Sequence, residues 1–284
     1  MSAQKGPLLT LPVHQALLAA RDTGAGLVEC SLDLGLSRSS VEVDAEGWSW
    51  NGRRFPYAAV CKDRTIYWWD GAGFEPVSRF SGGLIKLVPT EWGPPTFEID
   101  GIKMLPTARV SPYADAERKV GLIQPRGKTV LDTCGGLGYF AAWCIRGGAS
   151  RIQSYEKNPD VVWLRGLNPW SPDHEAAGTP LQLTPGDVSK EIAALPDQSF
   201  DAALHDPPRF GIAGELYSQV FYDQLARVLR PQARLFHYTG TPNKLTSGRD
   251  VPKEVAARLQ RAGFSTELNG DGVLAVKGGR QGRR

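Results

Sequence analysis

The stretch that decides the fold is Ser265–Lys277, STELNGDGVLAVK, near the end of the chain. It contains two β-prone runs, Ser265–Leu268 and Val273–Lys277, joined by the turn NGDG at 269–272, whose residues tolerate positive φ. Strands joined by so short a turn are antiparallel neighbours, because a parallel pair needs a crossover of about a dozen or more residues. The chain is therefore expected to close on a hairpin whose last strand runs against its partner.

Strand-like and helix-like segments alternate upstream of this hairpin, from Pro125 onward. The expected strands are Thr129–Cys134, Arg151–Glu156, Leu181–Leu183, Phe200–His205 and Arg234–Tyr238. The expected helices start at Leu137 and at Asp160 and then span Ser189–Leu195, Gly214–Leu229, closed by Pro231, and Val251–Ala262. Alternation at this spacing predicts parallel βαβ units in a doubly wound α/β sheet. With the terminal hairpin added, we expect a seven-stranded sheet with a reversed last strand.

The first part of the chain has a different pattern, of short strands separated by turns. Asn51-Gly52, Asp70-Gly71 and Asp100-Gly101 are strong hairpin signals next to β-prone runs. A preceding stretch, Leu8 to Arg21, has apolar residues at helical spacing. We therefore expect a β-hairpin-rich domain with a short N-terminal helix at 1–106, a cofactor-binding domain at 107–278 and a basic flexible tail at 279–284.

Composition narrows the class of protein. The chain has 284 residues, 41% hydrophobic and 22% charged, which excludes a disordered chain. Its apolar runs are far shorter than the roughly 20 residues of a membrane span, and its start lacks the order of a signal peptide, so we expect a cytoplasmic protein with no membrane partner. The four cysteines form no CxxC pair, and neither a disulfide framework nor a metal site is expected.

The first strand of the alternating part leads into the loop DTCGGLG at 132–138 and then a helix. The loop resembles the signature of class I S-adenosylmethionine-dependent methyltransferases, an acidic residue followed by alternating glycines. The resemblance implies that Asp132, Cys134, Gly136 and Gly138 line the cofactor. Because Cys134 stands at a usual glycine position, the turn there is expected either to have a negative φ or to accept some strain. The loop sequence also fits the glycine pattern of a dinucleotide-binding loop. In such a loop the Asp132 carboxylate would face a pyrophosphate of the same charge, which disfavours that alternative.

Two further acidic residues follow the next strands. Glu156 ends the second strand, where a carboxylate accepts hydrogen bonds from ribose hydroxyls; a solvated glutamate is the alternative. After the third strand, Asp187 and Val188 match the positions that hold the adenine amino group and pack on the ring in the resembling family. An ordinary helix N-cap is the alternative for Asp187. S-adenosyl-L-methionine is therefore the expected cofactor.

The string DPPRF at 206–210 directly follows a buried-looking strand. Two prolines fix φ and remove two backbone donors, so the loop is rigid and its carbonyls can accept from a substrate. It resembles the Asp/Asn-Pro-Pro-aromatic motif of methyltransferases that act on exocyclic or ring nitrogens. The resemblance implies that Asp206 and a carbonyl of Pro207 or Pro208 hold the target NH group, and that Phe210 stacks on the base.

One departure from that motif is Arg209, which stands where the family has its aromatic residue. A guanidinium there can stack, contact a phosphate or hold a carboxylate, and a purely structural turn is the alternative for the whole motif. His205, His237 and Tyr238, at neighbouring strand ends, are lesser catalytic candidates, and each histidine is expected to be structural.

A wider resemblance, over Ile99 to Lys277, points to a sparsely characterised group of predicted methyltransferases that is best known from archaea and is spermidine-synthase-like. It is carried by the Asp-Pro-Pro-Arg-Phe motif and by the strings GELYS at 214–218, FHYTG at 236–240 and LNPWS at 167–171. Trp170 in the last string is expected either to wall the cofactor or to pack. The segment before the first strand, with Tyr113, Arg118 and Lys119, often closes over the methionine end in this fold.

The leading interpretation is an S-adenosylmethionine-dependent methyltransferase that N-methylates an RNA base. Its expected partner is tRNA or rRNA, and both a monomer and a homodimer are compatible with the sequence. The alternatives are an aminopropyltransferase, which acts on polyamines with the same fold, and a small-molecule methyltransferase. A binding module without activity is disfavoured by the acidic residues kept at the strand ends. Tryptophans of the β domain, among them Trp48 and Trp50, are expected in its core, with base stacking as the alternative.

Overall fold

The structure is a computed structural model that describes residues 6–240 and 250–279. The expected basic tail lies, apart from Gly279, outside the described residues. The chain forms two compact units: the first comprises residues up to Asp115 together with Trp163–Ser171, and the second comprises the remainder. Each unit is described by itself.

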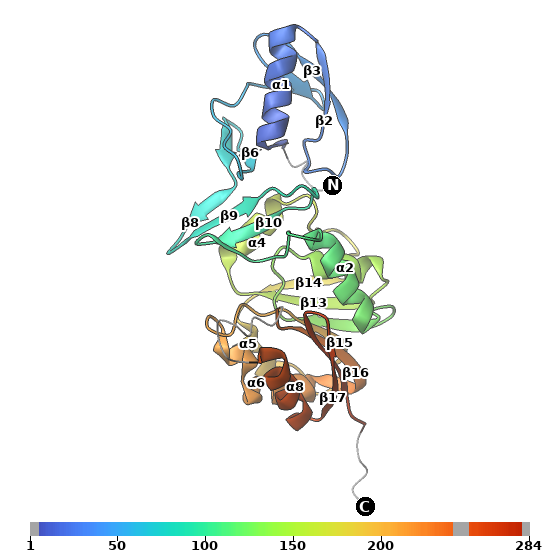
Figure 1. Cartoon of the computed structure of the whole chain (residues 1–284). Helices are drawn as coiled ribbons and strands as arrows, with labels where there is room; N and C mark the ends of the chain where they lie inside the picture. The colour runs from blue at the N-terminus through green and yellow to red at the C-terminus, as the bar shows by residue number, and fades with distance from the viewer. Residues whose placement is uncertain (1–5, 241–249, 280–284) are drawn as a thin grey trace, which may run out of the picture. The chain divides into compact units, whose positions relative to one another are not determined.

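Three small antiparallel sheets build the first unit, together with α1 (Leu11–Thr23). One sheet has the order β2 (Leu27–Cys30), β3 (Ser39–Val43), β4 (Trp48–Trp50) and β5 (Arg53–Phe55). A second has the order β1 (Leu8–Leu9), β6 (Tyr67–Trp69) and β7 (Phe74–Pro76). The third has the order β11 (Ile102–Lys103), β10 (Thr96–Ile99), β9 (Leu84–Val88) and β8 (Ser78–Phe80). Helix α1 packs against β2 and β3 (Figure 1).

The hairpin signals of the first unit are confirmed. Asn51 and Gly52 both take positive φ, 50° and 71°, between β4 and β5, and Asp100 and Gly101 do the same between β10 and β11, at 49° and 77°. Positive φ at both central residues matches the right-handed twist of the flanking strands. The aromatic content of these hairpins supplies the core, since Trp48 is fully buried and stacks on Phe55 at 4.8 Å.

The N-terminal helix starts three residues later than the periodicity predicts. Leu8 and Leu9 form the short strand β1, which pairs with Trp68 and Tyr67. The helix then runs from Leu11 to Thr23 and ends at Gly24, whose φ of 65° is left-handed. Tertiary pairing takes the first two apolar residues out of the helix.

A seven-stranded sheet forms the second unit. Its order is β14 (Leu181–Pro185), β13 (Arg151–Glu156), β12 (Thr129–Asp132), β15 (Phe200–His205), β16 (Leu229–Tyr238), β18 (Gly272–Lys277) and β17 (Phe264–Asn269). The five strands β14, β13, β12, β15 and β16 pair in parallel, and β18 is antiparallel to both of its neighbours. The predicted class I methyltransferase fold, with its reversed last strand, is thereby confirmed.

Helices cover the sheet on its two faces. Helix α3 (Tyr139–Arg146) and the last part of α2 (Pro112–Ile123) pack over Val130 and Ile152. On the other face lie α5 (Val188–Glu191), the 3₁₀ turn η1 (Ile192–Ala194), α6 (Gln219–Val228) and α8 (Val251–Arg261) (Figure 1). Helix α4 (Pro159–Leu167) follows β13.

The expected helix Gly214–Leu229 is wrong as a single element. It is split into the 3₁₀ turn η2 (Gly214–Tyr217) and α6, because the Ser218 side chain accepts a hydrogen bond from the Phe221 amide and caps α6 there. Pro231 does not close the helix; it lies inside β16. A register shift in the pairing of β15 with β16 and a positive φ of 67° at Gln232 accommodate it.

Within the described ranges, no helix is both long enough and apolar enough to cross a membrane. All four cysteines are free.

Candidate functional site

The site is built where the strand order of the second unit reverses. Chain order runs from β12 outward to β13 and β14, and then returns to the other side of β12 with β15. In open α/β sheets such a switch point opens a crevice at the carboxyl ends of the strands. Asp132 lies opposite Leu204 in the ladder, and the Thr133 amide donates to the Leu204 carbonyl over 3.1 Å. The glycine loop and the Asp-Pro-Pro loop are therefore neighbours.

The Asp132 carboxylate lies inside this edge of the sheet. Its side chain is buried, and its Oδ2 accepts a hydrogen bond from Ser154 Oγ on β13 over 2.7 Å. A buried carboxylate can stay charged only with good hydrogen bonds or a nearby cation. The position suits a residue that meets the ammonium end of a ligand at the strand terminus.

The glycine loop after Asp132 folds as the sequence predicts. Gly136 and Gly138 take left-handed φ values of 49° and 80°, whereas Cys134 is absent from the residues with positive φ, so a side chain is tolerated there. The Gly135 amide donates to the Tyr155 carbonyl on β13 over 2.7 Å. The loop is thus tied down before α3 begins.

Glu156, at the end of β13, holds that loop from the other side. Its Oε2 accepts from the Gly136 amide over 2.8 Å, and its Oε1 accepts from the Asn158 amide over 2.9 Å. Two backbone donors fix the orientation of the carboxylate. A hydrogen bond from a ribose hydroxyl to this carboxylate stays a prediction.

Asp187 is the N-cap of α5, the alternative named from the sequence. Its Oδ1 accepts from the Ser189 amide over 3.1 Å, and its Oδ2 pairs with Lys157 Nζ at 2.8 Å. Partial burial by itself raises the pKa of Asp187, but the hydrogen bonds from Lys157 and Ser189 outweigh it, so the pKa is lowered. Val188 beside it is buried in the core of this unit. Contact of either residue with adenine stays a prediction.

Lys157 is a site residue that no sequence pattern indicated. It directly follows Glu156, its side chain is mostly exposed, and the hydrogen bond with Asp187 raises its pKa. A lone lysine next to a strand end carries no signal of its own, because such lysines are usually solvated.

The environment of Asp206 is the second feature that the sequence did not show. Lys119 Nζ, on α2, lies 3.9 Å from Asp206 Oδ2, and the Lys119 side chain is only 1% exposed. The same ammonium lies over the Tyr238 ring at 3.9 Å from its centroid and 5.8 Å from that of Phe140. The Asp206 carboxylate is therefore paired with a buried cation that also contacts two aromatic rings.

The terminal hairpin contributes to this cluster through its turn residue Asp271. Arg118 donates to Asp271 Oδ1 over 2.5 Å, and Asp271 Oδ2 lies 3.9 Å from Lys119 Nζ. The Asp271 carbonyl in turn accepts from the Thr239 amide after β16. The position of Arg118 and Lys119 near the methionine end of the cofactor stays a prediction. In the structure Arg118 contacts the terminal turn, and Lys119 lies near both that turn and the Asp-Pro-Pro loop.

The proline loop is braced by Tyr217 of η2. The Tyr217 hydroxyl donates to the Pro208 carbonyl over 3.1 Å, so that carbonyl already has a donor. Within the described part of the chain, no donor reaches the carbonyl of Pro207, which is the remaining candidate for holding a target NH. Phe210 lies edge-on to the Tyr217 ring at 5.4 Å. Burial, with Asp206, Cys134 and Tyr238 adding to it, raises the pKa of Tyr217.

Cys134, in the glycine loop, is partly buried beside acidic side chains. Burial raises the pKa of its thiol well above the usual value, and the carboxylates of Glu156, Asp132 and Asp206 raise it further, against the opposing effect of a hydrogen bond with Thr133. The thiol is therefore protonated at neutral pH and is a poor nucleophile.

Both strand-end histidines are structural. His205 is fully buried, with Nε2 against the Leu216 carbonyl at 3.0 Å and Nδ1 against Thr133 Oγ1 at 2.6 Å. Burial lowers its pKa to about 4, so its neutral ring donates to the carbonyl and accepts from the threonine. His237 likewise bonds the Tyr222 hydroxyl and the Tyr238 carbonyl, and burial lowers its pKa.

Trp170 packs within the first unit. Its Nε1 donates to the Leu34 carbonyl over 3.0 Å, and its ring lies 5.1 Å from that of Tyr113. Of the two roles expected for Trp170, packing is the one with contacts in the structure.

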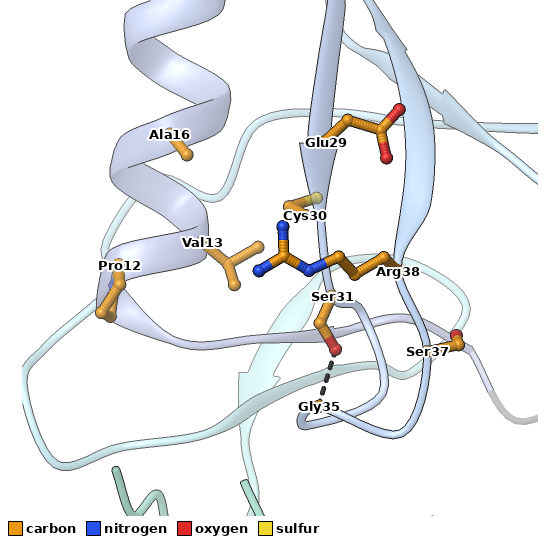
Figure 2. Close-up of a pocket in the computed structure, with 9 residues that line it drawn as sticks. All are labelled: Pro12, Val13, Ala16, Glu29, Cys30, Ser31, Gly35, Ser37 and Arg38. Carbon is orange, nitrogen blue, oxygen red and sulfur yellow. Dashed lines mark hydrogen bonds between the residues drawn. The ribbon is translucent and has the colours of Figure 1, made fainter. Parts of the chain in front are cut away.

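A separate hollow of about 390 Å³ lies in the first unit, between α1 and β2 (Figure 2). The Arg38 guanidinium reaches across it, near Val13 and Cys30. None of the site residues predicted from the sequence lines it. Among the described residues there is also no group of three or more His, Cys, Asp or Glu side chains that could hold a metal ion.

Comparison with known proteins identifies a relative whose alignment covers more than two thirds of each chain. No protein-family model matches the chain. It is 45% identical over 201 residues to the uncharacterized protein MJ1233 of Methanocaldococcus jannaschii, a match that covers 69% of this chain and 68% of that protein. It is 31% identical over 117 residues to polyamine aminopropyltransferase 2 of Streptomyces coelicolor, which covers 39% of this chain and only 21% of that protein.

The fold also has solved counterparts. A crystal structure of spermidine synthase in complex with the transition state analogue AdoDATO matches with a TM-score of 0.57 at 16% identity, over 71% of this chain and 73% of that chain. At that identity the match shows the fold alone.

Proposed function

The chain belongs to the same protein family as MJ1233 of Methanocaldococcus jannaschii, and from this premise we propose that it is an S-adenosylmethionine-dependent methyltransferase acting on a nitrogen atom. That relative is itself uncharacterized, so the proposal rests on the site.

The observation that carries the proposal is that the glycine loop and the Asp-Pro-Pro loop leave adjacent strands, because Asp132 on β12 pairs with Leu204 on β15 and the Thr133 amide donates to the Leu204 carbonyl over 3.1 Å. Asp132 and Glu156 lie on the proposed cofactor side of this edge of the sheet, and Asp206 lies on the proposed acceptor side. A donor group bound by the first two would present its reactive end next to the third. Group transfer between two bound substrates gains most from such alignment.

The residues present fit the proposed cofactor. The buried Asp132 carboxylate suits the ammonium of the methionyl part, and Glu156, oriented by the Gly136 and Asn158 amides, suits the ribose hydroxyls. When bound, S-adenosylmethionine supplies a sulfonium methyl group, whose C–S bond breaks as the C–N bond to the acceptor forms. Asp206 and the Pro207 carbonyl orient the acceptor NH, and Asp206 or water receives its proton.

An RNA base, in tRNA or rRNA, is the proposed acceptor. A base offers a planar NH group that two acceptor oxygens on a rigid loop can hold in line with a methyl donor. Phe210 and exposed Arg209 follow directly and can contact a base face or a phosphate.

Aminopropyl transfer is the second candidate, and specific observations favour it. The solved structure that matches with a TM-score of 0.57 is a spermidine synthase, and a curated relative of 31% identity is a polyamine aminopropyltransferase. Against it stands the ammonium of Lys119, 3.9 Å from Asp206, because a polyamine would bring a like charge to the same carboxylate.

The two candidates are separated by giving the purified protein matched donors and acceptors. Tritiated S-adenosylmethionine with total RNA is expected to label RNA, and decarboxylated S-adenosylmethionine with putrescine is expected to yield no spermidine. Nucleoside mass spectrometry of RNA from cells with and without the gene then identifies the base. Spermidine formation without RNA labelling would replace the first candidate by the second.

A further inference from the structure

The cluster around Lys119 has the composition of a binding site for a cationic amine. Such sites combine aromatic faces with a carboxylate. Here Tyr238 and Phe140 supply the rings, at 3.9 and 5.8 Å from the ammonium, and Asp206 supplies the carboxylate at 3.9 Å. The cation that fills the site belongs to the chain itself.

The charges of the cluster pair in a definite way. Arg118 and Asp271 form a close pair at 2.5 Å, whereas Lys119 lies 3.9 Å from both Asp271 and Asp206. Asp271 is thus shared between Arg118 and Lys119, and Asp206 faces the Lys119 ammonium from the end of β15. The Lys119 side chain is 1% exposed, so water and salt screen this charge little.

From this arrangement we propose that Lys119 determines acceptor specificity: as a built-in cation it occupies the amine site beside Asp206 and restricts the acceptor to nitrogens without positive charge. The inference deepens the proposed methyltransferase function and rests on it. A second ammonium at Asp206 meets repulsion from Lys119 and finds the aromatic faces already covered. A neutral NH of a base donates to the Asp206 carboxylate without that penalty.

The role is tested by emptying the site. The protein is first saturated with S-adenosylhomocysteine and then titrated calorimetrically with spermidine, for wild type, Lys119→Ala and Lys119→Arg. We expect spermidine affinity to rise at least about tenfold in Lys119→Ala, because the aromatic rings and Asp206 become available to a ligand cation. Lys119→Arg keeps the charge and is expected to stay within about threefold of wild type.

A double variant assigns the gain to the proposed site. Adding Asp206→Asn to Lys119→Ala is expected to return spermidine affinity to the wild-type value. If Lys119→Ala is too unstable to bind S-adenosylhomocysteine, Lys119→Met removes the charge, fills most of the volume and must show a gain in the same direction.

The outcomes distinguish a failure of the specificity role from a failure of the proposed function. Wild type that binds S-adenosylhomocysteine and also binds spermidine as tightly as the Lys119 variants would overturn the specificity role and leave the cofactor assignment intact. The specificity role is equally overturned if the variants bind the cofactor product normally and gain no spermidine affinity. Wild type that binds no S-adenosylhomocysteine would instead overturn the proposed function.

Discussion

Lys119 Nζ lies 3.9 Å from Asp206 Oδ2, although α2 and the end of β15 are far apart in the chain. The pair places a buried positive charge next to the carboxylate that follows the fourth strand of the sheet. A carboxylate held beside a cation on a rigid loop suits the role of an orienting hydrogen-bond acceptor.

Replacing Asp206 distinguishes a role in holding the acceptor from a role in binding the cofactor. Asp206→Ala is expected to remove methyl transfer to the true acceptor while S-adenosylhomocysteine affinity stays within about tenfold, since misplacing the acceptor by about 1 Å costs on the order of 100-fold in rate. Calorimetry and RNA labelling on the same preparation measure both. Near-wild-type turnover in this variant would indicate that Asp-Pro-Pro is a structural turn without a role in holding the acceptor.

Glu156→Ala is expected to weaken binding of S-adenosylhomocysteine by about 1–3 kcal/mol, because it removes charged hydrogen bonds to the ribose. Glu156 also accepts from the Gly136 amide, so part of the loss comes from a looser glycine loop. Glu156→Gln keeps one acceptor oxygen for that amide and is expected to lose less. An unchanged dissociation constant in both variants would exclude Glu156 from the cofactor site.

The ion pair of Asp187 makes a pH-dependent contribution to stability. Because its pKa is lowered in the folded protein, the contribution is present above the usual value of 3.8 and is lost as the pH falls through the lowered value. Asp187→Asn keeps a capping oxygen and removes this titration. Melting temperatures measured from pH 6 downward are expected to fall less in the variant, and parallel curves would contradict the assignment.

Gly272→Ala is expected to destabilise the second unit by about 1–3 kcal/mol through overpacking. A Cβ at this position would lie 2.5 Å from the His237 carbonyl oxygen and 2.6 Å from the Phe236 ring. The matched control is Gly121→Ala in α2, where a Cβ meets nothing within 4 Å, and it is expected to raise stability by up to about 1 kcal/mol. Urea unfolding of both variants decides, and equal stability of the two would contradict the packing.

The order of helices and strands in the second unit was accessible from the sequence because it depends on local patterns. The run Phe200–His205 was predicted with its bounds, and the terminal hairpin was recognised from the NGDG turn at 269–272. The split of Gly214–Leu229 was not, since the cap at Ser218 competes with a continuous helix and only packing decides between them.

Candidate residues that end strands were identifiable for the same reason. Asp132, Glu156 and Asp206 follow β-prone runs, and parallel strands present their carboxyl ends at one edge of the sheet. The ends of the strands that carry Asp132 and Asp206 are neighbours because β15 pairs with β12, which the sequence alone does not show.

The sequence by itself determined the α/β class, the reversed last strand, the glycine loop and the acidic strand ends, because each depends on residue type and short spacing. Only the tertiary structure decided that Lys119 pairs with Asp206, that Tyr217 takes the Pro208 carbonyl, and that Lys157 holds Asp187. Each of these pairs joins residues of different elements or loops, which the fold brings together. Their burial and charge balance exist only after the elements pack, which no local pattern encodes.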